Sequence, residues 1–75
     1  MTYLPVSSSA VKRIGYDPDS RTLGVIWPDD SVTHYLAVPR QAHTQLIMAD
    51  SIGRHINVHI KPVYKGIAVD AEASE

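Results

Sequence analysis

The chain has 75 residues, no cysteine and a formal net charge of −1. A domain of this length buries only about 60% of the surface that its unfolded chain exposes, so we expect one domain with a thin core and no deep catalytic cleft within a single copy. The lack of cysteine excludes disulfides, thiolate zinc sites and cysteine nucleophiles, and we expect no cofactor.

The amino-terminal residues contain no long apolar run and no basic start, so we predict neither a signal peptide nor a membrane span and expect a cytoplasmic protein of a bacterium or phage. Residues 1–65 carry seven Lys or Arg against five Asp, whereas the segment that follows adds only Asp70, Glu72 and Glu75. Small, acidic segments without aromatic residues cannot bury enough apolar surface to stay ordered. We therefore predict a single domain over residues 1–66 and a flexible acidic tail over 67–75.

The first half of the chain has the alternation of apolar and polar residues that is typical of strands. Three such segments cover residues 9–17, 21–27 and 32–38. The sequences DPDS and PDDS between them are rich in turn-forming residues. Short strands joined by tight turns pair antiparallel in chain order, so the sequence predicts a three-stranded β-meander.

The periodicity changes after Pro39, which is favourable in the first turn of a helix because its missing N–H needs no partner there. Residues 40–50 place Ala42, Leu46 and Ala49 on one stripe, which predicts a helix. The next segment is ambiguous. Ile56, Val58 and Ile60 alternate as in a strand, whereas Ile52, Ile56 and Ile60 recur as on one side of a helix.

Taken together, these segments resemble the KTSC domain, a small module at the carboxyl end of some lysyl-tRNA synthetases that also occurs as free-standing short proteins. The resemblance runs from residue 6 to 64 in consistent order. It is carried by Val6, Ser8, Ser9, Val11, the IGYD stretch at 14–17, Leu23, Val25, Tyr35, Val38, Pro39, Ala49, Ser51, Gly53, Asn57, Ile60, Lys61 and Tyr64. Where the family tends to have aromatics, this chain has Thr33, His43, His55 and Ile56, and it has Asp29 and Asp30 in place of a hairpin glycine, so it offers fewer surfaces on which bases could stack.

The resemblance implies a helical spacing for the ambiguous segment, with apolar residues at positions 56, 60 and 64 and a polar one at position 58. We therefore predict a second helix over residues 51–61, capped by Ser51 or Asp50, with Val58 partly exposed. The predicted fold class is α+β: a three-stranded antiparallel β-meander followed by one or two carboxyl-terminal helices packed on the sheet.

His55 and His59 are the weak candidates for a metal site. On a helix the two imidazoles share one face, whereas on a strand they would stand about 13 Å apart, too far for one ion. No spacing in the sequence identifies a third ligand; His34, His43 and Asp50 are named only because they could ligate a metal. We therefore predict no metal site.

Ser, His and Asp also occur in a combination that could be assembled into a catalytic triad, but no nucleophile motif is present and we predict no catalytic residue.

A group of polar and basic residues forms the candidate ligand-binding patch. The hydroxyls of the SSS stretch, together with other polar side chains at family positions, could bind a small ligand, a peptide or an RNA backbone. The alternative is that these hydroxyls satisfy nearby backbone groups and that Tyr35 and Trp27 belong to the core. The predicted patch consists of Ser8, Ser9, Arg13, Tyr16, Tyr35, Ser51, Arg54, Asn57 and Lys61.

The sequence favours a non-catalytic binding module that acts through a partner protein or by self-association, because three strands would leave two sheet edges unpaired. Two alternatives remain open. One is a nucleic-acid or nucleotide binder, suggested by the synthetase association and by Arg13, Arg54 and Lys61, although the basic residues are scattered along the chain. The other is a small hydrolase whose site is shared between subunits.

Overall fold

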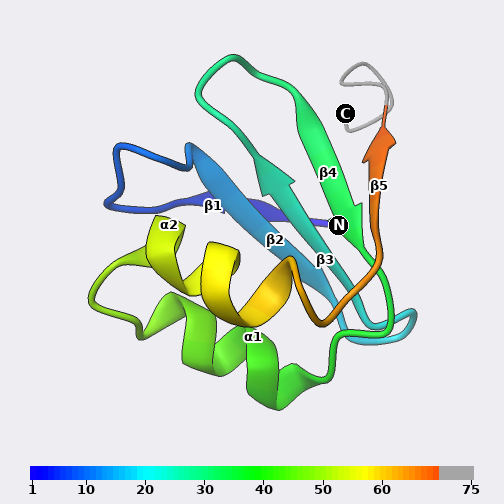
Figure 1. The fold of residues 1–75 in the computed structure, drawn as a ribbon. Coiled ribbons are helices and arrows are strands. Elements are labelled where there is room, and N and C mark those ends of the chain that lie inside the picture. Colours follow the sequence, from blue (N-terminus) through cyan, green and yellow to red (C-terminus); the bar gives the residue numbers. More distant parts are fainter. Residues whose placement is uncertain (70–75) are drawn as a thin grey trace.

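The computed structural model describes residues 1–69 as a five-stranded antiparallel sheet with its helical segments on one face (Figure 1). The strands lie in the order β1-β2-β3-β4-β5, which is also their order along the chain. Their bounds are β1 Tyr3–Pro5, β2 Arg13–Asp17, β3 Thr22–Ile26, β4 Val32–Tyr35 and β5 Gly66–Val69. The helices, α1 Arg40–Ile47, α2 Ile52–His55 and the π-helical η1 Ile56–Ile60, lie between β4 and β5 in the sequence.

The three predicted strands are present as β2, β3 and β4, and the two predicted helical segments follow them, so the α+β class is confirmed. The predicted number of strands is wrong, because β1 and β5 add one strand to each edge of the meander. Residues 9–12, predicted as the start of the first strand, instead belong to the loop that returns from β1 to β2.

Strand β5 corrects the expectation for the end of the chain. Residues 67–69, which we assigned to a flexible tail, pair with β4, and the Leu36 N–H extends this ladder by donating to the Lys65 carbonyl oxygen over 2.9 Å. The remainder of the predicted tail, residues 70–75, lies outside the described residues.

The core lies between the sheet and the helices. Ile14, Leu23, Val25 and Tyr35 project from the helix-covered face of the sheet, in register with one another across β2, β3 and β4. They pack into one cluster with the buried side chains of the helices and flanking segments, namely Val11, Val38, Leu46, Ile52, Ile56 and Ile60.

The second predicted helix is confirmed over the ambiguous segment, where α2 passes directly into η1. Ser51 caps it by accepting a hydrogen bond from the Arg54 N–H over 3.4 Å. Ile56 and Ile60 are buried and Val58 is 52% exposed, as the helical spacing requires. The β-branched residues are tolerated here because burial of the isoleucine side chains outweighs their modest loss of helix propensity.

The sheet face turned away from the helices, the outer face, is crossed by Tyr3. The Tyr3 ring passes over Gly15 and Gly24, and its hydroxyl forms a 2.9 Å hydrogen bond with His34 Nε2 on β4. A Cβ at Gly24 would lie 2.7 Å from Tyr3 Cε2, so only glycine leaves room for the ring. A side chain of β1 is thereby tied to β4, three strands away.

Within residues 1–69, the structure contains no helix with the length and apolar character needed to cross a membrane.

Candidate functional site

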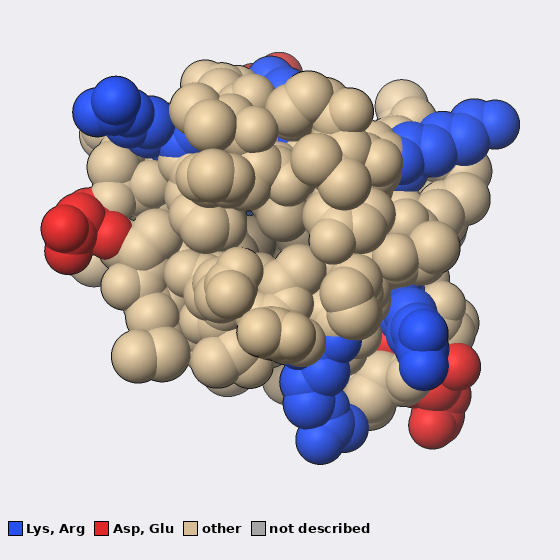
Figure 2. Space-filling view, turned by 60° about the horizontal axis from the view of Figure 1, so that its bottom comes forward, with Lys and Arg blue, Asp and Glu red and all other residues tan. Residues whose placement is uncertain are grey.

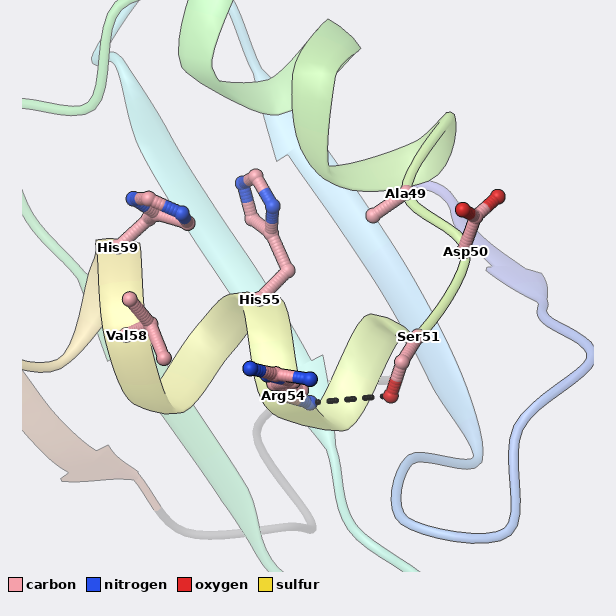
Figure 3. A pocket seen from close by; sticks show the side chains of 7 residues that line it. All are labelled: Ala49, Asp50, Ser51, Arg54, His55, Val58 and His59. Atoms are coloured by element: carbon pink, nitrogen blue, oxygen red, sulfur yellow. Dashed lines mark hydrogen bonds between the residues drawn. The ribbon is translucent and has the colours of Figure 1, made fainter.

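Two hollows lie next to each other at the helical face. The β1–α1 groove, of about 660 Å³, is lined by Leu4, Pro5, Val6, Ser7, Ile14, His43, Ile47, Ala49, Asp50 and Ile52. The His-pair pocket, of about 320 Å³, is lined by Ala49, Asp50, Ser51, Arg54, His55, Val58 and His59 (Figure 3). Because Ala49 and Asp50 line both hollows, the segment between α1 and α2 is their common wall.

The β1–α1 groove is largely apolar. Ile14 and Ile52 are buried parts of its lining, while Leu4 on β1 and Ile47 at the end of α1 stay 63% and 48% exposed. Met48, adjacent to Ile47, is 76% exposed. Large apolar side chains from two elements that are distant in the sequence thus border one hollow.

His43 is held in a fixed orientation in this groove. Its ring stacks on Tyr16 with 4.7 Å between ring centroids and 6° between ring planes. Tyr16 is itself fixed, since its hydroxyl donates to the Val38 carbonyl oxygen over 2.6 Å. Burial lowers the pKa of His43 below its ordinary value, so the ring adds no charge to the groove at neutral pH.

The free edge of β1 is protected against addition of another strand. The Val6 N–H donates to the Lys12 carbonyl oxygen over 3.4 Å, so it faces β2. Because N–H groups alternate in direction along a strand, the nitrogen of Pro5 faces the free edge, where it has no hydrogen to donate. The groove beside β1 is therefore better suited to receive side chains than an added strand.

The His-pair pocket brings together two histidines from consecutive turns of α2 and η1. The ring centroids of His55 and His59 are 4.7 Å apart and the ring planes are tilted by 45°. Burial, and to a lesser extent the neighbouring His59, lowers the pKa of His55. Within residues 1–69 neither ring hydrogen-bonds to another side chain or to the backbone, so the ring nitrogens are available to a ligand.

The predicted ligand-binding residues are only partly gathered. Ser51 and Arg54 line the His-pair pocket. The others lie outside both linings, and several have structural contacts. Ser8 Oγ accepts a hydrogen bond from the Ala10 N–H over 3.1 Å, Tyr35 is buried in the core, and Lys61 Nζ lies 5.3 Å from the centre of the Trp27 ring.

The remaining members of the predicted patch lie on several elements. Ser9 is exposed in the loop between β1 and β2, and Asn57 is exposed on η1. Arg13 neighbours Ile14 on β2 and so projects from the outer face, opposite the helices. Tyr16 does not line the groove but stacks on His43, which does. Arg13 and the buried Tyr35 therefore do not share an exposed surface with the residues of the helical face.

Of the residues considered as a third metal ligand, His34 and His43 lie outside the His-pair pocket, and Asp50 lines it without completing a site. His34 bonds to Tyr3 on the outer face and His43 stacks on Tyr16, while Asp50 lines the pocket. No group of three or more His, Asp or Glu in residues 1–69 is arranged to hold a metal ion.

In the same residues no serine hydroxyl hydrogen-bonds to a histidine, so the side chains of a catalytic triad are not aligned there.

The sequence patterns did not reveal the β1–α1 groove. Its exposed apolar residues gave a weak signal, since Leu4 lies in a strand of three residues and Ile47 is the last residue of a helix. Only the packing of β1 beside α1 shows that they border one hollow.

A family model, two relatives and one solved structure are similar to this chain over most of its length. The family model of the KTSC domain matches residues 7–64. An uncharacterized protein of Stutzerimonas stutzeri is 37% identical over 62 residues, which cover 83% of this chain and 87% of the relative. A protein of Tsukamurella paurometabola is 34% identical over 65 residues, 87% of this chain and 97% of the relative. The crystal structure of a KTSC domain protein from Yersinia pestis superposes with a TM-score of 0.88 at 36% identity, covering 92% of this chain and 97% of that one.

Proposed function

The chain belongs to the KTSC domain family, and from that premise we propose that it is a non-catalytic interaction module that binds a partner protein through the β1–α1 groove. The observation that carries this proposal is the apolar lining of the groove, which includes the exposed side chains of Leu4 and Ile47. We place its action in the cytoplasm.

Partner binding would be favourable because it would remove these exposed apolar side chains from water. Fully burying one Leu, Ile or Met side chain contributes roughly 1.5–3 kcal/mol. Exposed apolar side chains that cluster around a concave surface commonly mark interaction sites, whereas isolated ones need no explanation. Covering the groove with a partner would therefore supply a substantial part of a binding free energy.

The groove also indicates the chemistry of the partner. Its only ionisable lining residues are His43 and Asp50, and Pro5 disfavours addition of a strand at the β1 edge. Figure 2 shows that the helical face is uncharged over its centre and carries basic and acidic residues at its margins. These features fit an apolar side chain presented by a helix or loop of the partner, rather than an extended strand.

We propose to test this with peptides selected for binding from a displayed random library. Peptides with a bulky apolar residue should bind, and ¹⁵N chemical shifts should change around Leu4 and Ile47. Ile47→Glu should weaken binding at least tenfold, because it places a charge in the apolar lining. Val63→Glu is the matched control, since Val63 is 64% exposed and lies outside the groove.

Equal weakening by both variants, or shift changes confined to other surfaces, would count against the groove as the binding site. A concentration-dependent dimer that Ile47→Glu dissociates would identify the occupant as a second copy of the chain. RNA binding that falls steeply with salt and is insensitive to Ile47→Glu would favour the nucleic-acid alternative.

A further inference from the structure

We propose that His55 and His59 form half of a zinc site that is completed by the same two residues of a second copy, so that one zinc ion joins two chains. The proposal concerns the His-pair pocket and is independent of the β1–α1 groove.

The first step is the geometry of the pair. Zinc binds imidazole nitrogen at about 2.0–2.1 Å, and two nitrogens on one tetrahedral ion are then roughly 3.3 Å apart. The rings of His55 and His59 have centroids 4.7 Å apart and project on the same side of the helix (Figure 3). A centroid separation of 4.7 Å is compatible with one nitrogen of each ring binding the same ion.

The second step is the availability of the ring nitrogens. Within residues 1–69 neither imidazole is engaged by a hydrogen bond, in contrast to His34, which bonds to Tyr3. His59 is exposed and His55 is half-buried, so an ion can reach both from solvent. Asp50 and Arg54 line the same pocket with opposite charges, and both are exposed, so water screens the effect of each on a bound cation.

The third step is the number of ligands. Structural zinc sites are closed by four protein ligands, yet in residues 1–69 no third His, Asp or Glu joins the pair. A two-fold axis through the ion supplies the second His55 and His59 and completes a tetrahedral set of four nitrogens. Such an isologous contact uses the same surface patch on both copies, so it closes at a dimer.

The surroundings fit a close approach of two copies. Val58 lies one position before His59, lines the pocket and is 52% exposed. In a dimer around the ion, Val58 of each copy would lie near the axis and be covered, which removes apolar surface from water.

The test is sedimentation velocity and native mass spectrometry of the full chain, first dialysed against EDTA and then titrated with zinc chloride. We expect a dimer that holds one zinc ion per two chains and that dissociates when EDTA is added again. His55→Ala and His59→Ala should each abolish the zinc-dependent dimer. His34→Gln should form it normally, because this control changes a histidine outside the pocket and keeps a polar partner for Tyr3.

Val58→Lys retains both ligands and places like charges near the axis, so it should weaken the dimer. Circular dichroism establishes that each variant is folded. The proposal is overturned if zinc does not bind, if one ion binds per chain without dimer formation, or if folded His59→Ala still dimerises with zinc.

Discussion

Gly53 joins two segments that are far apart in the chain. It is the second residue of α2, and a Cβ placed on it would lie 2.6 Å from the Cβ of Ala10 in the loop between β1 and β2. This contact brings the SSSA stretch against the SIG stretch, two parts of the sequence that carry the resemblance to the KTSC domain. Ala10 and Gly53 thus have a packing role where the two stretches meet. Ser8 and Ser51 each accept a hydrogen bond from a nearby backbone N–H group.

Replacing Gly53 with Ala is expected to destabilise the protein. In an exposed helix this substitution stabilises by about 1 kcal/mol, but overpacking at a close contact costs typically 1–3 kcal/mol. Urea denaturation should therefore show a lower free energy of unfolding for Gly53→Ala. The double variant Ala10→Gly/Gly53→Ala removes the clash and should recover part of the loss; no recovery would show that the contact with Ala10 is not the cause.

His43 gives the fold a defined pH response. Its pKa is lowered by burial, so the unfolded chain binds a proton more readily than the folded one. The stability that this difference contributes is complete above the ordinary pKa of about 6.5 and is lost as the pH falls through the lower pKa of the folded state.

Denaturation at pH 7.5 and at pH 5 should therefore show the wild type losing stability on acidification. His43→Gln cannot take up the proton and should lose less over the same interval. This interval lies above the range in which Asp17 and Asp29 titrate, because hydrogen bonds lower the pKa of both carboxyls. An identical loss in both proteins would place the pH dependence on other groups.

At the scale of the elements, the sequence predicted the long periodic segments and missed the short ones. The stripes of Leu46 on α1 and of Ile52, Ile56 and Ile60 on α2 and η1 repeat often enough to distinguish a helix from a strand once the family spacing is considered. Strand β1 has three residues and includes Pro5, and β5 consists of the four residues GIAV before an acidic segment. Such short strands exist because neighbouring strands pair with them, a cause that local patterns do not contain.

The contribution of β5 can be measured by truncation. A chain ending at residue 65 leaves the hydrogen-bonding groups of β4 without their partners and uncovers Tyr35, against which Gly66 is packed. We expect it to unfold at a clearly lower urea concentration than a chain ending at residue 69. Because the two proteins differ only in residues 66–69, the difference isolates β5, and equal midpoints would show that this strand adds no stability.

At the scale of the whole molecule, the candidate sites were harder to predict than the fold. The i, i+4 spacing of His55 and His59 was visible in the sequence. The helix that places both side chains on one face was also predicted. The β1–α1 groove was not predicted, because it depends on how β1 packs beside α1. Arg13 is separated from Arg54 because it projects from the outer face while Arg54 lies on α2, a separation that the positions of the basic residues in the sequence do not reveal.

The strand order has a mechanical consequence. Since β1 and β5 occupy opposite edges of the sheet, the first residue of β1, Tyr3, and the last residue of β5, Val69, are four strand positions apart, while Met1 lies over Gly24 on the outer face. A pulling force applied through Tyr3 and Val69 acts across the strands, so it would open the backbone ladders one bond at a time instead of shearing many at once. Under tension the domain should therefore yield at low force, and the bond between Tyr3 and His34 is placed to resist the release of β1.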